Sequence, residues 1–107
     1  MNTSALDYQE QQVLRRALEY WVEHWDWECP TLFGLEKDDL FSVLQTWPTV
    51  TAGAETTALA ALGALRELLY GASAPGKEKI QSTLGITFTD AERLCSKTLT
   101  LADQVLS

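Results

Sequence analysis

Residues 53–70, GAETTALAALGALRELLY, set the architecture of this chain. Drawn as a helix at about 100° per residue, the five leucines at positions 59, 62, 65, 68 and 69 spread around much of its circumference, so neighbouring elements should cover it on several sides. Ala60, Gly63 and Ala64 would let those neighbours approach closely. We therefore predict a central helix, and Gly71 is expected to terminate it in the left-handed conformation.

Four further segments show helical periodicity between chain breakers, and none alternates with the period of two that indicates a strand. They are residues 4–27, capped by Ser4 and stopped by Cys29-Pro30; residues 35–47, stopped by Pro48; residues 75–84, opened by Pro75 and ended by Gly85; and a last helix from the capping box Thr89-x-x-Glu92 to about Val105. The sequence thus predicts an all-α fold, a compact bundle of about five helices forming a single domain over residues 1–107.

Two of these helices carry a clear apolar stripe. In the first helix, one arc joins Leu14, Ala17, Leu18, Trp21, Val22 and Trp25. In the last helix, a seam joins Ala91, Leu94, Cys95, Thr98, Leu101, Ala102 and Val105. Both stripes are expected to face the core.

Composition excludes several classes of function. Of 107 residues, 46% are hydrophobic, and the formal net charge of −7 opposes direct binding of nucleic acid, which depends on Lys and Arg. No apolar stretch is long enough to span a bilayer, and the start of the chain lacks the pattern of a signal peptide, so we expect a cytoplasmic protein. Cys29 and Cys95 lack zinc spacing and are expected to be reduced and unpaired.

No catalytic signature or cofactor motif is present. His24 is the only histidine, with no Ser or Cys partner at a suitable spacing, and its neighbour Glu28 alone is a weak basis for a metal site. Residues 80–94 have the layout of a helix-turn-helix, but Asp90 and Glu92 would meet DNA phosphates with the wrong charge. We expect no catalytic residues, metal or cofactor; an enzyme using His24 and surplus carboxylates ranks third among the functions considered.

Acidic and aromatic residues concentrate in residues 1–47. That part holds nine acids and three bases, a balance of −6, and all four tryptophans. In the stretch YWVEHWDWE, residues 20–28, aromatic and acidic side chains interleave, and the angular positions of Tyr20 and Trp27 lie outside the core arc. Such a composition is typical of an interface with aromatic anchors and steering charges. The predicted partner contacts are Glu19, Tyr20, Glu23, Asp26, Trp27, Glu28, Asp38 and Asp39.

Through residues 20–28 and 36–39, the chain resembles the small acidic immunity proteins that bacteria make against nuclease toxins in colicin and contact-dependent growth inhibition systems. The resemblance is one of size and surface character. It implies a cytoplasmic inhibitor, monomeric when free, that binds a basic RNase or tRNase domain and occludes its active-site groove without performing chemistry itself.

An alternative is a helical adaptor or antitoxin. Such a protein would dimerise or bind a partner helix through the seam from Ala91 to Val105. The two hypotheses differ in the state of that seam, which the first requires to be buried within the monomer and the second requires to be accessible.

Overall fold

The computed structural model describes residues 1–106, and within them all regular structure is helical. After a 3-10 turn at Thr3–Ala5 come α1 (Tyr8–His24), α2 (Cys29–Phe33), α3 (Lys37–Thr46), α4 (Ala54–Tyr70), α5 (Lys77–Leu84) and α6 (Phe88–Leu106). The predicted all-α fold is confirmed, and each of the five predicted helices is present. The short helix α2 is an addition that the sequence did not predict.

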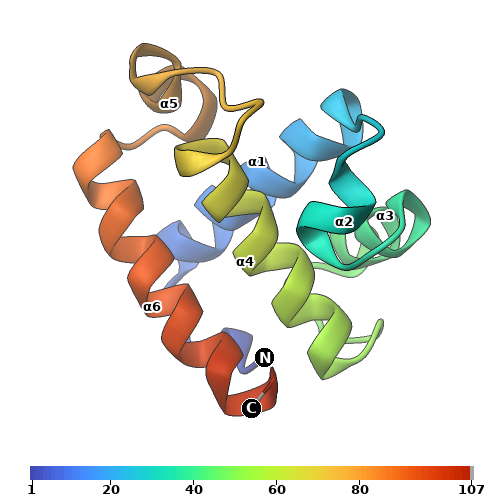
Figure 1. Cartoon of the computed structure of the whole chain (residues 1–107). Helices are drawn as coiled ribbons and strands as arrows, with labels where there is room; N and C mark the ends of the chain where they lie inside the picture. Colours follow the sequence, from blue (N-terminus) through green and yellow to red (C-terminus); the bar gives the residue numbers. More distant parts are fainter. Residues whose placement is uncertain (107) are drawn as a thin grey trace.

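Helix α4 occupies the centre, as its leucines predicted. In Figure 1 it crosses in front of α1, with α6 on one side and α2 and α3 on the other. It packs against all five other helices. Eleven of its seventeen residues are buried, and Gly63 lies so close to α2 that a Cβ there would be 2.8 Å from Cδ2 of Phe33. The small residues of α4 therefore allow the close packing that the sequence suggested.

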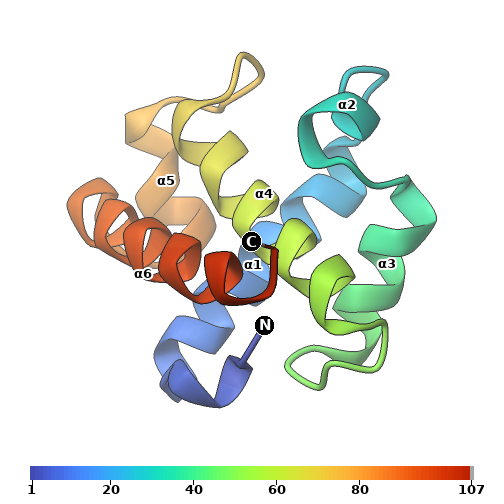
Figure 2. The same cartoon turned by 60° about the horizontal axis from the view of Figure 1, so that its bottom comes forward.

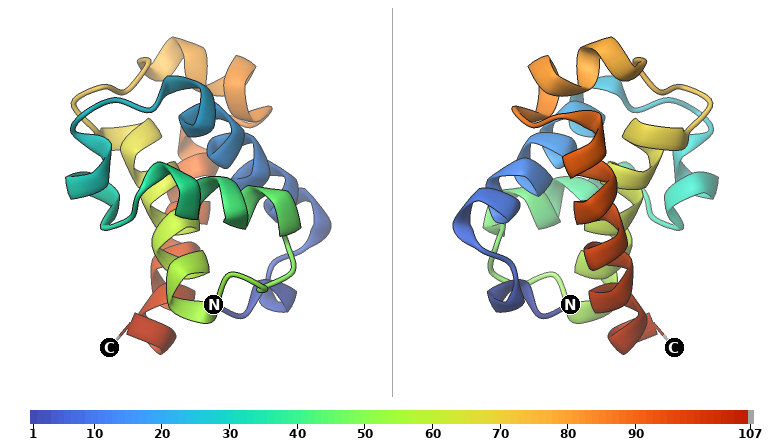
Figure 3. Two further views of the ribbon diagram at one scale, coloured as in Figure 1. Left: turned by 90° about the vertical axis from the view of Figure 1, so that its right-hand side faces the viewer. Right: turned by 90° about the vertical axis from the view of Figure 1, so that its left-hand side faces the viewer.

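One apolar core joins all six helices. Leu14 and Trp21 of α1, Leu40 of α3, Leu65 of α4 and Leu84 of α5 are almost completely buried, and the indole Nε1 of Trp21 donates a hydrogen bond of 2.8 Å to the carbonyl oxygen of Ala64. Val22 and Trp25 of the predicted arc are only partly buried. Figures 2 and 3 show the start of the chain and the end of α6 at the same end of the bundle.

Helix ends differ from the sequence prediction at several points. Helix α1 begins after Asp7, not Ser4, because Asp7 and Glu10 form a capping box, and Ser4 belongs to the preceding 3-10 turn. It ends at His24, before the predicted stop at Cys29-Pro30. That step instead opens α2, where proline is tolerated because the first helical N–H groups need no partner within the helix.

The ends of α4, α5 and α6 also differ from the predicted ones. Gly71 adopts an extended conformation at φ −74°, not the predicted left-handed one, whereas Gly85 is left-handed at φ 80°. Helix α5 begins at Lys77, two residues after Pro75. The capping box predicted at Thr89 is absent: Thr87 caps α6 by accepting a hydrogen bond from the N–H of Asp90.

Candidate protein-binding site

The turn between α1 and α2 is built around Asp26. One carboxylate oxygen accepts hydrogen bonds from the N–H groups of Glu28 (2.9 Å) and Cys29 (3.2 Å), and the other accepts one from the hydroxyl of Ser73 (3.3 Å). These contacts, above all the one from the Glu28 N–H, lower the pKa of Asp26. Asp26 was predicted as a partner contact, and the structure shows its carboxylate already engaged in holding the turn.

Trp27 projects from this turn into solvent. Its side chain is 85% exposed, the largest exposed fraction among the large hydrophobic side chains described. Beside it lies a hollow of about 280 Å³, called here the Trp27 notch, which is lined by Trp27, Glu28, Thr31 and Leu32. Within residues 1–106 the carboxylate of Glu28 has no hydrogen-bond or ion-pair partner. The notch thus combines an open indole face with an uncommitted negative charge.

Contacts with the core hold α2, which forms one side of the notch, in place. Phe33 is 2% exposed and packs against Trp21 and Trp25 with ring centroids 5.7 and 5.2 Å away. On α4, the guanidinium of Arg66 donates a hydrogen bond of 3.0 Å to the carbonyl oxygen of Leu32. Both contacts tie α2 to the core, so the surface that carries Trp27 is organised before any partner arrives.

A second group of predicted residues lies on α1 facing α5. Glu19, Tyr20 and Glu23 line a shallow pocket of about 220 Å³ together with Arg16 and Thr83. In addition, the carboxylate of Glu19 is 3.7 Å from Nε of Arg15 across one helical turn. That exposed pair contributes little stability, and a partner cation could compete for the acid.

Tyr20 and His24 form a small aromatic unit on the same helix. Their rings stack with centroids 4.1 Å apart and an interplanar angle of 10°. His24 Nδ1 lies 2.8 Å from the carbonyl oxygen of Tyr20, so the histidine is held in place by its own helix. Burial raises the pKa of Tyr20 above its ordinary value.

Asp38 and Asp39 form a third group, in the first turn of α3. Both are exposed, and Asp39 caps the helix by accepting a hydrogen bond of 3.1 Å from the N–H of Glu36. Neither residue lines the Trp27 notch or the Glu19 pocket. The structure therefore distributes the eight predicted contacts over three patches: one at the α1–α2 turn, one on α1 and one on α3.

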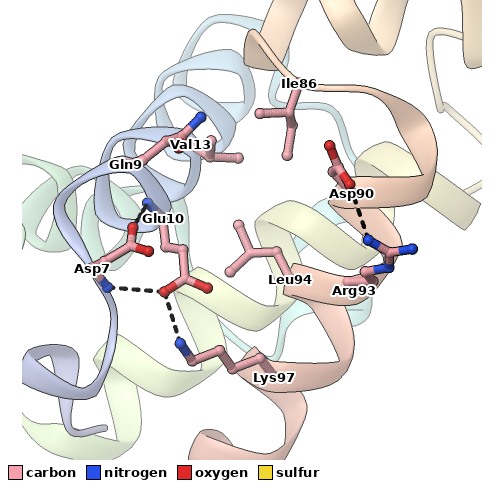
Figure 4. A pocket seen from close by; sticks show the side chains of 9 residues that line it. All are labelled: Asp7, Gln9, Glu10, Val13, Ile86, Asp90, Arg93, Leu94 and Lys97. Carbon is pink, nitrogen blue, oxygen red and sulfur yellow. Dashed lines mark hydrogen bonds and ion pairs between the residues drawn. The ribbon is translucent and has the colours of Figure 1, made fainter.

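A further hollow, between α1 and α6, was not predicted from the sequence. It measures about 340 Å³ and lies between the start of α1 and the first half of α6, with Val13, Ile86 and Leu94 as its apolar lining (Figure 4). Its charges pair with one another: Lys97 Nζ lies 2.8 Å from Glu10, and Arg93 lies 3.5 Å from Asp90. The sequence gave no signal for it, because the two walls are about eighty residues apart in the chain.

The seam of α6 is largely closed within the monomer. Ala91, Leu94, Cys95, Thr98, Leu101 and Ala102 are buried and Val105 is half-buried, in a helix that packs mainly on α4. A partner could reach this seam only if α6 left the bundle. Leu99 and Tyr70, on the outer side of the α4–α6 contact, are about half exposed and border a hollow of about 240 Å³.

The cysteines show no sign of reactivity. Cys29 and Cys95 are both buried and unpaired, and burial raises the pKa of each thiol. Among residues 1–106 no group of three or more His, Cys, Asp or Glu side chains is placed to hold a metal ion. No helix in that range is both long and apolar enough to cross a membrane.

Comparisons with known proteins identify no relative of this chain. No protein family matches this chain, and no match is found among curated proteins or among solved structures.

Proposed function

We propose that this chain is an immunity protein that binds a basic nuclease toxin domain and covers its substrate groove. The observation that carries the proposal is the Trp27 notch, where an 85% exposed indole stands beside the unpartnered carboxylate of Glu28. Tryptophan is the residue type most enriched among those that dominate binding energy at protein interfaces. Burial of this exposed indole by a partner is favourable, because its apolar surface is removed from water.

Unpaired carboxylates in each of the three patches favour a cationic partner. In addition to Glu28, the carboxylates of Glu23 and Asp38 have no partner within the described residues. A nuclease must attract a phosphate backbone, so its substrate groove is basic. A protein of net charge −7 can dock there and exclude the substrate by charge and by volume.

The decisive experiment is growth rescue in cells that produce the protein encoded by the adjacent upstream gene, combined with an interaction assay between the two purified proteins. We expect the chain to restore growth and to bind with an association rate that falls as salt rises. The triple substitution Glu23→Gln, Trp27→Ala, Glu28→Gln should weaken binding at least tenfold. Glu55→Gln, an exposed acid at the start of α4, is the matched control. Rescue and binding left intact by the triple substitution would refute the proposed surface.

A further inference from the structure

The structure points to a specific occupant of the Trp27 notch: we propose that it receives an arginine side chain from the surface of a basic protein. This inference rests on the proposed function, because it names the chemical group of the partner that the same surface would bind. It depends on the size of the notch, the residues that line it and the contacts that hold them.

Size limits the occupant. The notch encloses about 280 Å³, less than the roughly 300–1,000 Å³ of pockets that bury drug-sized molecules. It is also open to solvent along the face of Trp27, which is 85% exposed. A single long side chain presented by another protein fits such a hollow better than a free metabolite does.

The lining selects the charge of the occupant. An apolar side chain would cover the indole but would also take the unpartnered Glu28 carboxylate out of water, which is costly without a compensating positive charge. A phosphate group would meet that carboxylate with the same sign. A cation satisfies both walls, because it is attracted to the face of the indole and to the carboxylate.

The lining also distinguishes arginine from lysine. A guanidinium is planar, so it can stack on the indole of Trp27 while its edge donates hydrogen bonds to Glu28. An ammonium is compact and strongly hydrated, and it cannot lie flat on a ring. Arg66, which contacts α2, is already committed, because it donates hydrogen bonds to the carbonyl oxygen of Leu32 and to Glu67.

The backbone beneath the notch is held in place before binding. Asp26 fixes the backbone N–H groups of Glu28 and Cys29, and Arg66 fixes the carbonyl of Leu32. An incoming arginine therefore meets a notch whose backbone is already ordered, so binding has to order side chains only: its own and those of Trp27 and Glu28.

The test is a nuclear magnetic resonance titration of the isolated full-length protein, read at the indole N–H signals of its four tryptophans. The signal of Trp27 is assigned with Trp27→Phe. The probes are a tri-arginine peptide and a tri-lysine peptide of equal charge. We expect the arginine peptide to shift the Trp27 signal and to bind about three- to tenfold more tightly than the lysine peptide.

Variants separate the two walls. Glu28→Gln should weaken binding of the arginine peptide by about three- to tenfold. Trp27→Leu should remove the preference for the arginine peptide over the lysine peptide. Glu55→Gln should change neither the affinity nor the preference. Because Trp27 is exposed, Trp27→Leu should leave the remaining amide signals in place, which checks that the fold is intact. Equal binding of both peptides, or shifts that leave the Trp27 signal unmoved, would overturn the arginine assignment.

The outcome is independent of the growth-rescue assay. If rescue succeeds and Trp27→Leu and Glu28→Gln rescue as well as the unsubstituted protein, the immunity function stands and the arginine anchor is wrong. If the arginine peptide binds at Trp27 but no rescue occurs, the notch chemistry stands and the immunity function fails.

Discussion

Replacing Gly63 with alanine tests how closely α2 packs on α4 beside the turn that carries Trp27. Two effects oppose one another in this variant. Alanine in a helix interior is favoured over glycine by about 1 kcal/mol. The new Cβ, however, would lie 2.8 Å from Cδ2 and 3.2 Å from Cε2 of Phe33, and forcing an extra methyl into a filled core costs about 1–3 kcal/mol.

The surroundings of Phe33 decide which effect is larger. Its ring is 2% exposed and is enclosed on its other sides by Trp21 and Trp25, so it cannot move without displacing one of them. We therefore expect Gly63→Ala to lower the free energy of unfolding by about 1 kcal/mol net. With a urea m-value of about 1–3 kcal/mol per M, the midpoint should fall by roughly 0.3–1 M.

The assay is urea unfolding followed by circular dichroism, performed in two backgrounds. In a Phe33→Ala background, which lacks the ring atoms that the new Cβ would meet, Gly63→Ala should become stabilising by about 1 kcal/mol through helix propensity alone. The difference between the backgrounds measures the coupling of the two positions. If Gly63→Ala stabilises the protein equally in both backgrounds, the reasoning about this contact is refuted.

Three further predictions concern single contacts. Thr57→Val should raise the free energy of unfolding by about 1 kcal/mol, because the buried Thr57 hydroxyl has no partner in the described structure; a fall in the urea midpoint would contradict this. A double-mutant cycle on Glu10→Gln and Lys97→Met should give a coupling of about 0.2–1 kcal/mol, reduced by salt, since both side chains are partly exposed. The pKa of Asp26 is lowered in the folded state, so its contribution to stability is present above the unfolded pKa, near 3.8, and is lost as pH falls through the lower folded pKa. The free energy of unfolding, measured from pH 5 to pH 2, should therefore depend less on pH in Asp26→Asn than in the unsubstituted protein. An unchanged pH profile would contradict the role of Asp26 in the turn.

The sequence predicts the helices well because each depends on residues close together in the chain. Helical periodicity between breakers located all five long helices, and the leucines of α4 predicted its central position. Helix ends were less certain because several residues nearby could serve as caps. Asp7 with Glu10 and Thr89 with Glu92 have the same capping spacing, yet only the first pair forms the box. Which cap forms depends on how the flanking chain packs, which a local pattern does not contain.

The candidate site was predictable only in part, for a similar reason. Trp27 is exposed as predicted, but the reason given was wrong, because α1 ends at His24 and Trp27 lies in the turn that follows. Tyr20, which the same angular argument placed outside the core arc, is partly buried against the core. The sequence pattern could not show that Asp26 is engaged, because its contacts with the N–H groups of Glu28 and Cys29 depend on a turn that was not predicted, and its hydroxyl partner Ser73 lies 47 residues away. Nor could it show that Asp38 and Asp39 lie on a different patch from Trp27. Charge and aromatic content identify the character of a surface, whereas the fold determines which of its members can act together.

That division of roles gives the acidic residues unequal importance. Asp26, Asp39 and Glu10 each satisfy backbone N–H groups or a lysine of this chain, so replacing them perturbs the fold before it perturbs binding. Glu23 and Glu28 make no such contact through their carboxylates within residues 1–106, and their negative charge is a small repulsive cost to the free protein. Under the proposed function a cationic partner would offset that cost, and variants of these two residues should therefore separate binding from stability.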